Sequence, residues 1–180
     1  MTVDYHPAMT TAASAASAPP TSRVSTRQAI ITGWLLCGVL DISAACIQQW
    51  IKSGNTPGRV LRGVASGLWG AAAINQGAGM AAIGLAMHFT VALTATLVFY
   101  ALSRRITALR SAPLWLIGPL YGVVVFCTMN YATLPALTWV RSLYLHTPLK
   151  WPGNMSWPQV WIHMGCVGLP IVWGVRRAGK

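Results

Sequence analysis

Four long apolar stretches, at about residues 28–50, 80–103, 112–139 and 157–175, limit what this chain can fold into. A helix needs about 20 apolar residues to cross the ~30 Å hydrocarbon core of a bilayer, and each stretch approaches that length. Only 8% of the residues are charged, against roughly a quarter in a soluble domain. The sequence therefore predicts an all-α fold, an integral membrane four-helix bundle, with the lipid bilayer as its solvent.

The net charge of +11 indicates membrane topology and not nucleic-acid binding, because the basic residues flank the apolar stretches. Cytoplasmic loops of membrane proteins carry an excess of Lys and Arg. One side of the predicted bundle collects eight basic residues and the other side five. We therefore expect a multi-pass protein of the bacterial inner (plasma) membrane with both termini in the cytoplasm. The eight are Arg23, Arg27, Arg104, Arg105, Arg110, Arg176, Arg177 and Lys180; the five are Lys52, Arg59, Arg62, Arg141 and Lys150.

Two segments of the chain differ from the four apolar stretches. Residues 1–27 are rich in Ala, Ser, Thr and Pro, which predicts a disordered tail before a transmembrane domain at 28–176. Thr56 and Pro57 have the form of a helix start, and the following apolar residues share one face. A helix at 57–69 is too short to span. We expect an amphipathic interfacial helix there, with a re-entrant segment as the alternative.

Small residues in the spans indicate close helix packing. Gly118 and Gly122 form a GxxxG pair, which suits packing within one bundle or across a homodimer. Pro135 and Pro170 are expected to kink or end their helices. The first stretch also carries a row of small and polar residues suited to facing other helices: Gly33, Cys37, Asp41, Ala45 and Gln48.

Each apolar stretch contains one strongly polar residue near its middle: Asp41, His88, Asn130 and His163. At about 1.5 Å per residue, all four fall roughly 18–26 Å from the inner boundary. Asp4 is the other acidic residue and lies in the predicted tail. Polar groups in hydrocarbon are costly and mark functional sites in many membrane proteins. These four residues are therefore the candidate polar site.

Two interpretations of this polar layer stay open. The residues can serve only as interhelical hydrogen-bonding groups, or they can form a site that handles protons or a small ligand. Within the second interpretation, His88 and His163 are also candidate axial ligands of a b-type haem, and with Asp41 candidate ligands of a metal ion. No spacing in the sequence supports a haem or metal cofactor specifically.

Signatures of common enzymes are lacking in the sequence. It contains no Gly-rich phosphate loop, no HExxH and no GxSxG, and its four cysteines have no CxxC spacing. We therefore expect a non-enzymatic protein. A redox subunit, a homodimer and an accessory subunit of a larger membrane complex remain as alternatives.

Several short motifs, taken in order, resemble small bacterial inner-membrane proteins that include the YagU-like family. The resemblance covers about residues 30–175. It implies four spans with a short helix after the first, and it implies no activity, substrate or cofactor. The motifs are Val60-Leu61-Arg62-Gly63-Val64-Ala65-Ser66-Gly67-Leu68-Trp69-Gly70, Gly84-Leu85-Ala86-Met87-His88-Phe89, Tyr121-Gly122, Met129-Asn130-Tyr131, His163-Met164 and Val167-Gly168-Leu169-Pro170.

Overall fold

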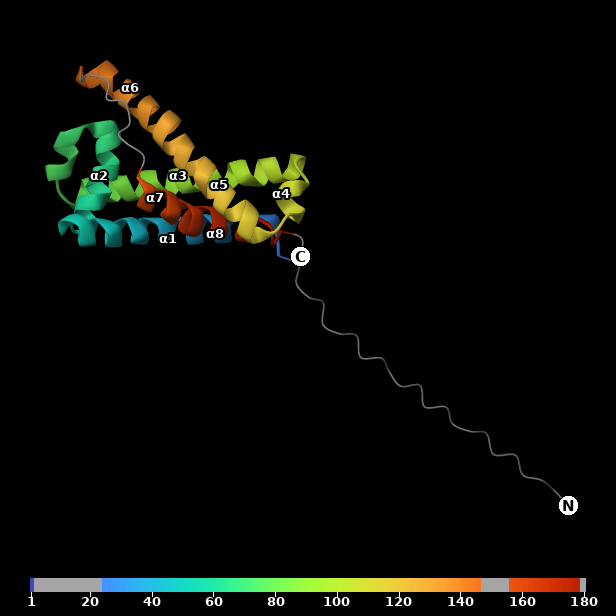
Figure 1. The fold of residues 1–180 in the computed structure, drawn as a ribbon. Helices are drawn as coiled ribbons and strands as arrows, with labels where there is room; N and C mark the ends of the chain where they lie inside the picture. The colour runs from blue at the N-terminus through green and yellow to red at the C-terminus, as the bar shows by residue number, and fades with distance from the viewer. Residues whose placement is uncertain (2–23, 147–155, 179–180) are drawn as a thin grey trace.

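The computed structural model describes residues 1, 24–146 and 156–178, and within these ranges the chain is helical with no strand (Figure 1). Three helical runs are long and apolar enough to cross a membrane. The predicted all-α class is therefore confirmed, and the three runs fit a multi-pass membrane protein. They are α1 (Thr26–Ser53), α3 (Ala78–Arg105), and the run of α5 (Leu114–Thr128), η2 (Met129–Thr133) and α6 (Leu134–Leu145).

Local sequence signals set the two ends of α1. The Ser25 hydroxyl accepts from the Gln28 N–H, and the Gln28 side chain accepts from the Ser25 N–H, which makes a reciprocal capping box. At the other end Gly54 adopts a left-handed conformation with φ 65°, which glycine reaches without steric cost. Most of the predicted tail lies outside the described residues, although Thr26 already belongs to α1.

The short helix α2 (Pro57–Trp69) occupies the range in which the sequence predicts a helix. The Thr56 hydroxyl accepts from the Arg59 N–H and Pro57 stands at the first position, as the sequence indicates. The helix runs across the direction of the long helices (Figure 1) and packs on α3, where Gly84 leaves room for the Leu61 carbonyl. A 3-10 turn, η1 (Ala71–Asn75), follows it. The position of α2 relative to the bilayer stays a prediction.

The last helical segment is divided into three parts, α7 (Trp157–Ile162), η3 (His163–Gly168) and α8 (Leu169–Val175). It packs against α1 and α5, and a one-turn helix, α4 (Ala108–Ser111), connects α3 to α5. This segment is not among the three runs that meet the length and hydropathy of a span. A fourth span, and with it the four-helix bundle, stays a prediction.

Two prolines are accompanied by wide helical turns. The π-helical turn η2 ends two residues before Pro135, and the π-helical turn η3 ends two residues before Pro170. A proline in a helix lacks an N–H donor, and its ring collides with the carbonyl four residues earlier, so the local widening relieves that collision. The helix continues through both prolines and ends at neither.

A buried cluster of mainly apolar side chains forms the packed core of the bundle. Phe99, Ile171 and Val172 are fully buried, and the buried hydroxyl of Thr96 donates to the Ala92 carbonyl of its own helix at 2.8 Å. Many large apolar side chains lie instead on the outer surface, among them Leu36, Val98 and Leu120. Such an outer surface suits contact with lipid.

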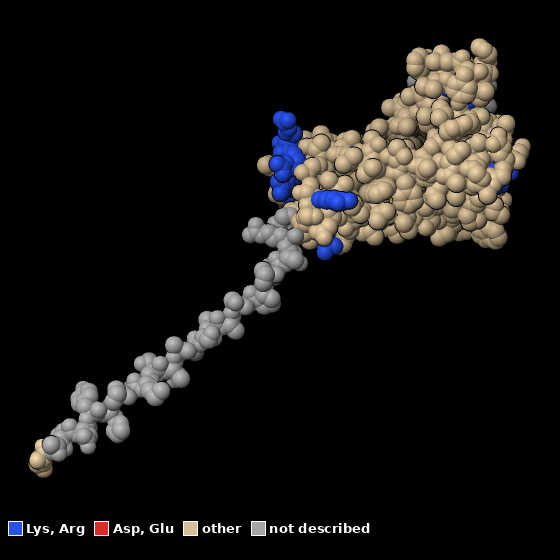
Figure 2. All heavy atoms as spheres, turned by 180° about the vertical axis from the view of Figure 1, so that it is seen from behind, with Lys and Arg blue, Asp and Glu red and all other residues tan. Residues whose placement is uncertain are grey.

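The start of α1, the end of α8 and the helix α4 lie at one end of the bundle (Figure 1). Basic side chains gather at this end (Figure 2). The described basic residues on the helix ends found there are Arg27, Arg104, Arg105, Arg110, Arg176 and Arg177.

Candidate intramembrane polar site

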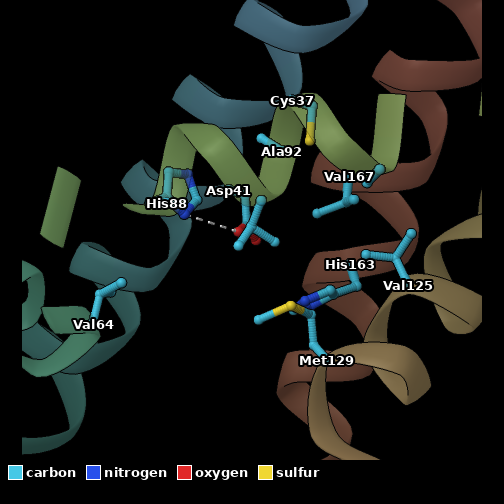
Figure 3. Close-up of a pocket in the computed structure, with 11 residues that line it drawn as sticks. Cys37, Asp41, Val64, His88, Ala92, Val125, Met129, His163 and Val167 are labelled. Atoms are coloured by element: carbon cyan, nitrogen blue, oxygen red, sulfur yellow. Dashed lines mark ion pairs between the residues drawn. The ribbon is translucent and has the colours of Figure 1, made fainter. Parts of the chain in front are cut away.

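A cavity of about 130 Å³ lies in the middle of the bundle and contains three of the four predicted polar residues. Asp41 comes from α1, His88 from α3, and His163 from the first position of η3. Figure 3 shows Asp41 between the two imidazoles, which reach the cavity from different helices. Three segments far apart in the sequence thus place an acid and two imidazoles around one space.

Asp41 and His88 face each other across α1 and α3, and they form an ion pair when His88 is protonated. The Nδ1 atom of His88 lies 3.9 Å from Oδ2 of Asp41, and the two side chains are 13% and 19% exposed respectively. The other ring nitrogen, Nε2, lies 2.8 Å from the carbonyl oxygen of Gly38. A carbonyl only accepts, so Nε2 carries a proton and donates. In neutral His88 the unprotonated Nδ1 therefore faces the carboxylate, and one added proton completes the pair.

His163 is oriented by its own helix. Its Nδ1 lies 2.8 Å from the Gln159 carbonyl and donates to it, and its ring packs edge-on against Phe126 at a centroid distance of 5.4 Å. Neutral His163 therefore keeps Nε2 as an acceptor. Because His163 lines the cavity, this nitrogen is the one left to bind a proton or a donor group.

Asn130 does not join the other three residues. It lies on η2, and its amide nitrogen donates to the Phe126 carbonyl of the same helical run at 2.9 Å. The residue that reaches the cavity from this turn is its neighbour Met129. The widened turn changes the angular spacing of the helix, which a count based on 3.6 residues per turn does not anticipate.

Apolar residues from five elements complete the cavity wall. Cys37 lies one helical turn before Asp41, and the row of small residues in the sequence indicates its inward position. Val64, Met129 and Val167 appear in the sequence analysis only within short motifs, and the remaining wall residues, Val91, Ala92, Ala95 and Val125, were not singled out there. No polar pattern marks them, since they provide only an apolar lining, which strengthens the electrostatic interactions inside.

The described residues do not assemble a metal centre. Among residues 24–146 and 156–178, no group of three or more His, Cys, Asp or Glu side chains is close enough to hold a metal ion. The four cysteines are free, and Cys37 is buried.

Comparison of the chain with protein-family models, curated proteins and solved structures finds no match. The resemblance to the YagU-like proteins therefore stays a prediction. The chemistry of the site rests on the geometry described above.

Proposed function

We propose that this protein is a non-enzymatic membrane bundle whose interior site, formed by Asp41, His88 and His163, takes up and releases protons. The observation that carries the proposal is the pairing of Asp41 with the one nitrogen of His88 that is free to accept a proton. Imidazole is the side chain that changes charge most readily near neutral pH. A carboxylate beside it provides the counter-charge for the protonated form.

The surroundings of the pair support proton exchange. A cavity needs roughly 10–15 Å³ to hold one water molecule, so the volume of about 130 Å³ has room for water beside the polar groups. Around this cavity, the titratable groups contributed by described residues are Cys37 and Asp41 on α1, His88 on α3 and His163 on η3. The walls from α2, α5 and η2 are apolar, so no further described charge competes for the proton.

We also propose four spans in the bacterial inner membrane, with both termini in the cytoplasm. The six described arginines at the end shared by the start of α1 and the end of α8 support this orientation (Figure 2). Four described basic residues, Lys52, Arg59, Arg62 and Arg141, belong to the segments of the opposite end. An excess of basic residues marks the cytoplasmic side.

Infrared difference spectroscopy tests the proton site directly, because the sequence has only two acidic side chains. Reconstituted protein is titrated from about pH 8 to pH 5, the range in which imidazole changes charge. We expect the carboxylate stretching bands of Asp41 to shift over this range, because the facing His88 ring gains its proton and charge. The Asp41→Asn variant should lose that signal.

Asp4→Asn is the matched control, since Asp4 lies in the sequence-predicted tail. Its spectrum should equal that of the unmodified protein. An unchanged signal in Asp41→Asn, or carboxylate bands that do not change throughout the titration of the unmodified protein, would contradict a proton-exchanging site.

A further inference from the structure

A second, larger cavity of about 290 Å³ lies between α3 and the run of α5 and η2. Its walls are mostly apolar. Four hydroxyl-bearing residues line it, Thr94, Tyr121, Thr128 and Thr133. The hydroxyls of Thr94 and Thr128 donate to carbonyls of their own helices, both at 2.9 Å, and that of Tyr121 donates to the Ala95 carbonyl. We call this cavity the apolar groove; its lining includes Val91, Val98, Leu102, Val124 and Thr128.

The apolar groove adjoins the polar cavity. Val91, Ala95, Val125 and Met129 line both spaces. The two cavities therefore lie side by side along these four side chains, and their volumes together fall within the roughly 300–1,000 Å³ that small-molecule sites occupy. We call the two cavities together the composite space; its polar end carries an acid and two imidazoles, and its other end is mostly apolar.

The packing of the helices explains why the groove exists. α3 packs on α1 and α2, whereas α5 packs on η3 and α8. α3 and α5 meet where the Tyr121 hydroxyl donates to the Ala95 carbonyl at 2.6 Å and its ring packs on Phe99 at 4.8 Å between centroids. These contacts hold the helices in place. Val98 and Val124 on the groove are 46% and 50% exposed, so the groove opens on the surface that faces lipid.

The shape and chemistry of this space define a class of ligand. A cavity of about 150 Å³ in another protein holds one benzene ring, so the polar cavity suits a single six-membered ring. When His163 is protonated, its Nε2–H, on the nitrogen that does not contact the Gln159 carbonyl, suits an oxygen acceptor on that ring. The groove suits an attached hydrocarbon chain. A phospholipid fits poorly, because its charged headgroup belongs at the membrane surface and the polar cavity lies in the middle of the bundle.

We propose that the composite space binds an isoprenoid quinone, with its ring in the polar cavity and its chain in the apolar groove. The proposal rests on the proposed function, since it assigns a ligand to the same three polar residues. The proposal also has the quinone enter sideways from the bilayer, between α3 and α5. A neutral ring that carries carbonyl oxygens reaches this depth without the cost of burying a charged group.

Val98→Phe tests the groove without altering a polar residue. The phenyl ring should fill the space that the chain occupies, while the partial exposure of Val98 allows the protein to fold. The probe is decylubiquinone, titrated into purified protein and followed by the quenching of its tryptophan fluorescence. We expect the dissociation constant to rise roughly tenfold or more, the factor that corresponds to about two buried methylene groups.

Leu97→Phe is the matched control, because Leu97 is the neighbouring residue on α3, is similarly exposed at 44%, and does not line the groove. It should bind decylubiquinone as the unmodified protein does. Equal binding by both variants, or equal affinity for decanol, a chain without the ring, would overturn the quinone assignment. Thermal unfolding of each variant verifies that the fold is retained.

The two proposals fail separately. If the infrared bands of Asp41 change with pH but decylubiquinone shows no saturable binding, the quinone assignment is wrong and the proton site stands. If decylubiquinone binds with the expected variant effects but the bands of Asp41 do not change with pH, the ligand site stands and the proton function is wrong.

Discussion

Backbone carbonyls orient both His88 and His163, but each carbonyl accepts from a different ring nitrogen. His88 donates through Nε2 to Gly38 on a neighbouring helix, whereas His163 donates through Nδ1 to Gln159 on its own helix. Each contact fixes which nitrogen is free. The free nitrogen of His88 faces a carboxylate, and that of His163 belongs to a ring on the same cavity. Two chemically identical side chains are thereby given different partners, so they are not interchangeable.

Arg176 provides a prediction at the scale of single residues. Its guanidinium donates to the Leu109 carbonyl at 2.8 and 2.6 Å and to the Ala112 carbonyl at 2.7 Å, which ties the end of α8 to the α4 connection. Burial lowers the pKa of this guanidinium, yet arginine stays protonated at neutral pH. Arg176→Gln should reduce the free energy of unfolding by about 1.5–3 kcal/mol, measured by thermal or denaturant unfolding in detergent.

Arg177→Gln is the control for that measurement. Arg177 is exposed and lies 4.6 Å from the centre of the Trp173 ring, a cation–π contact worth about 0.5–1 kcal/mol at an exposed site. An equal loss of stability in both variants would show that the carbonyl contacts of Arg176 contribute nothing of their own.

Three of the candidate polar residues could be placed in one site from the sequence because charged and imidazole groups are rare in an apolar helix. The helical rise puts Asp41, His88 and His163 at similar depths, and polar groups at that depth are costly in lipid. The interior of the bundle was therefore the expected position for all three. Asn130 has the same predicted depth, but its side chain bonds to the Phe126 carbonyl of its own helical run and does not line the cavity. Direction depends on the local helical pitch, and the π-helical turn at Met129–Thr133 leaves no distinct pattern in the sequence beyond the proline that follows it.

At the scale of elements, α5 and η3 pack closely, as α2 and α3 do. A side chain added at Gly168 would overlap the carbonyl oxygen of Gly118, and one added at Gly122 would overlap that of His163. The GxxxG pair of α5 therefore serves packing within the chain, against η3. Because His163 begins η3, these glycines also set how near the imidazole stands to the other helices.

Gly168→Ala is the prediction at this scale. The new methyl group meets backbone atoms, which cannot move aside as a flexible side chain can. We expect a loss of about 1–3 kcal/mol in the free energy of unfolding, the usual cost of overpacking. Unfolding monitored by tryptophan fluorescence measures this loss.

Gly165→Ala is the matched control on the same turn, because nothing lies within 4 Å of its added methyl group. It should match or slightly exceed the stability of the unmodified protein, since alanine favours a helix over glycine. A stable Gly168→Ala protein would mean that α5 and η3 are farther apart than described.

At the scale of the whole molecule, charge is divided between the two ends of an apolar body (Figure 2). The all-α class and the long apolar helices followed from the sequence because the bilayer length and the helical rise leave little freedom. The packing of α2 on α3 and α6 could not be predicted from the sequence. It depends on a glycine opposite a carbonyl, at Gly84 and Leu61, and on contacts such as the Arg141 guanidinium with the Ser66 carbonyl at 3.1 Å.

Fusions at the C-terminus test the proposed orientation of the whole molecule. Green fluorescent protein folds in the cytoplasm, whereas alkaline phosphatase needs the oxidising periplasm to form its disulfides. We expect a fluorescent fusion with the first reporter and an inactive fusion with the second. An active phosphatase fusion would place the C-terminus, and with it the arginine-rich end, outside.

The arginines at the ends of the helices have a consequence for the lipids around them. The chain holds 13 basic residues and two acidic ones, and one of the two acids faces His88 inside the bundle. Almost every cation must therefore find its neutralising partner outside the polypeptide. Anionic phospholipids attract each basic residue near the surface by about 1 kcal/mol, so the composition of the surrounding leaflet becomes part of what fixes this protein at its depth.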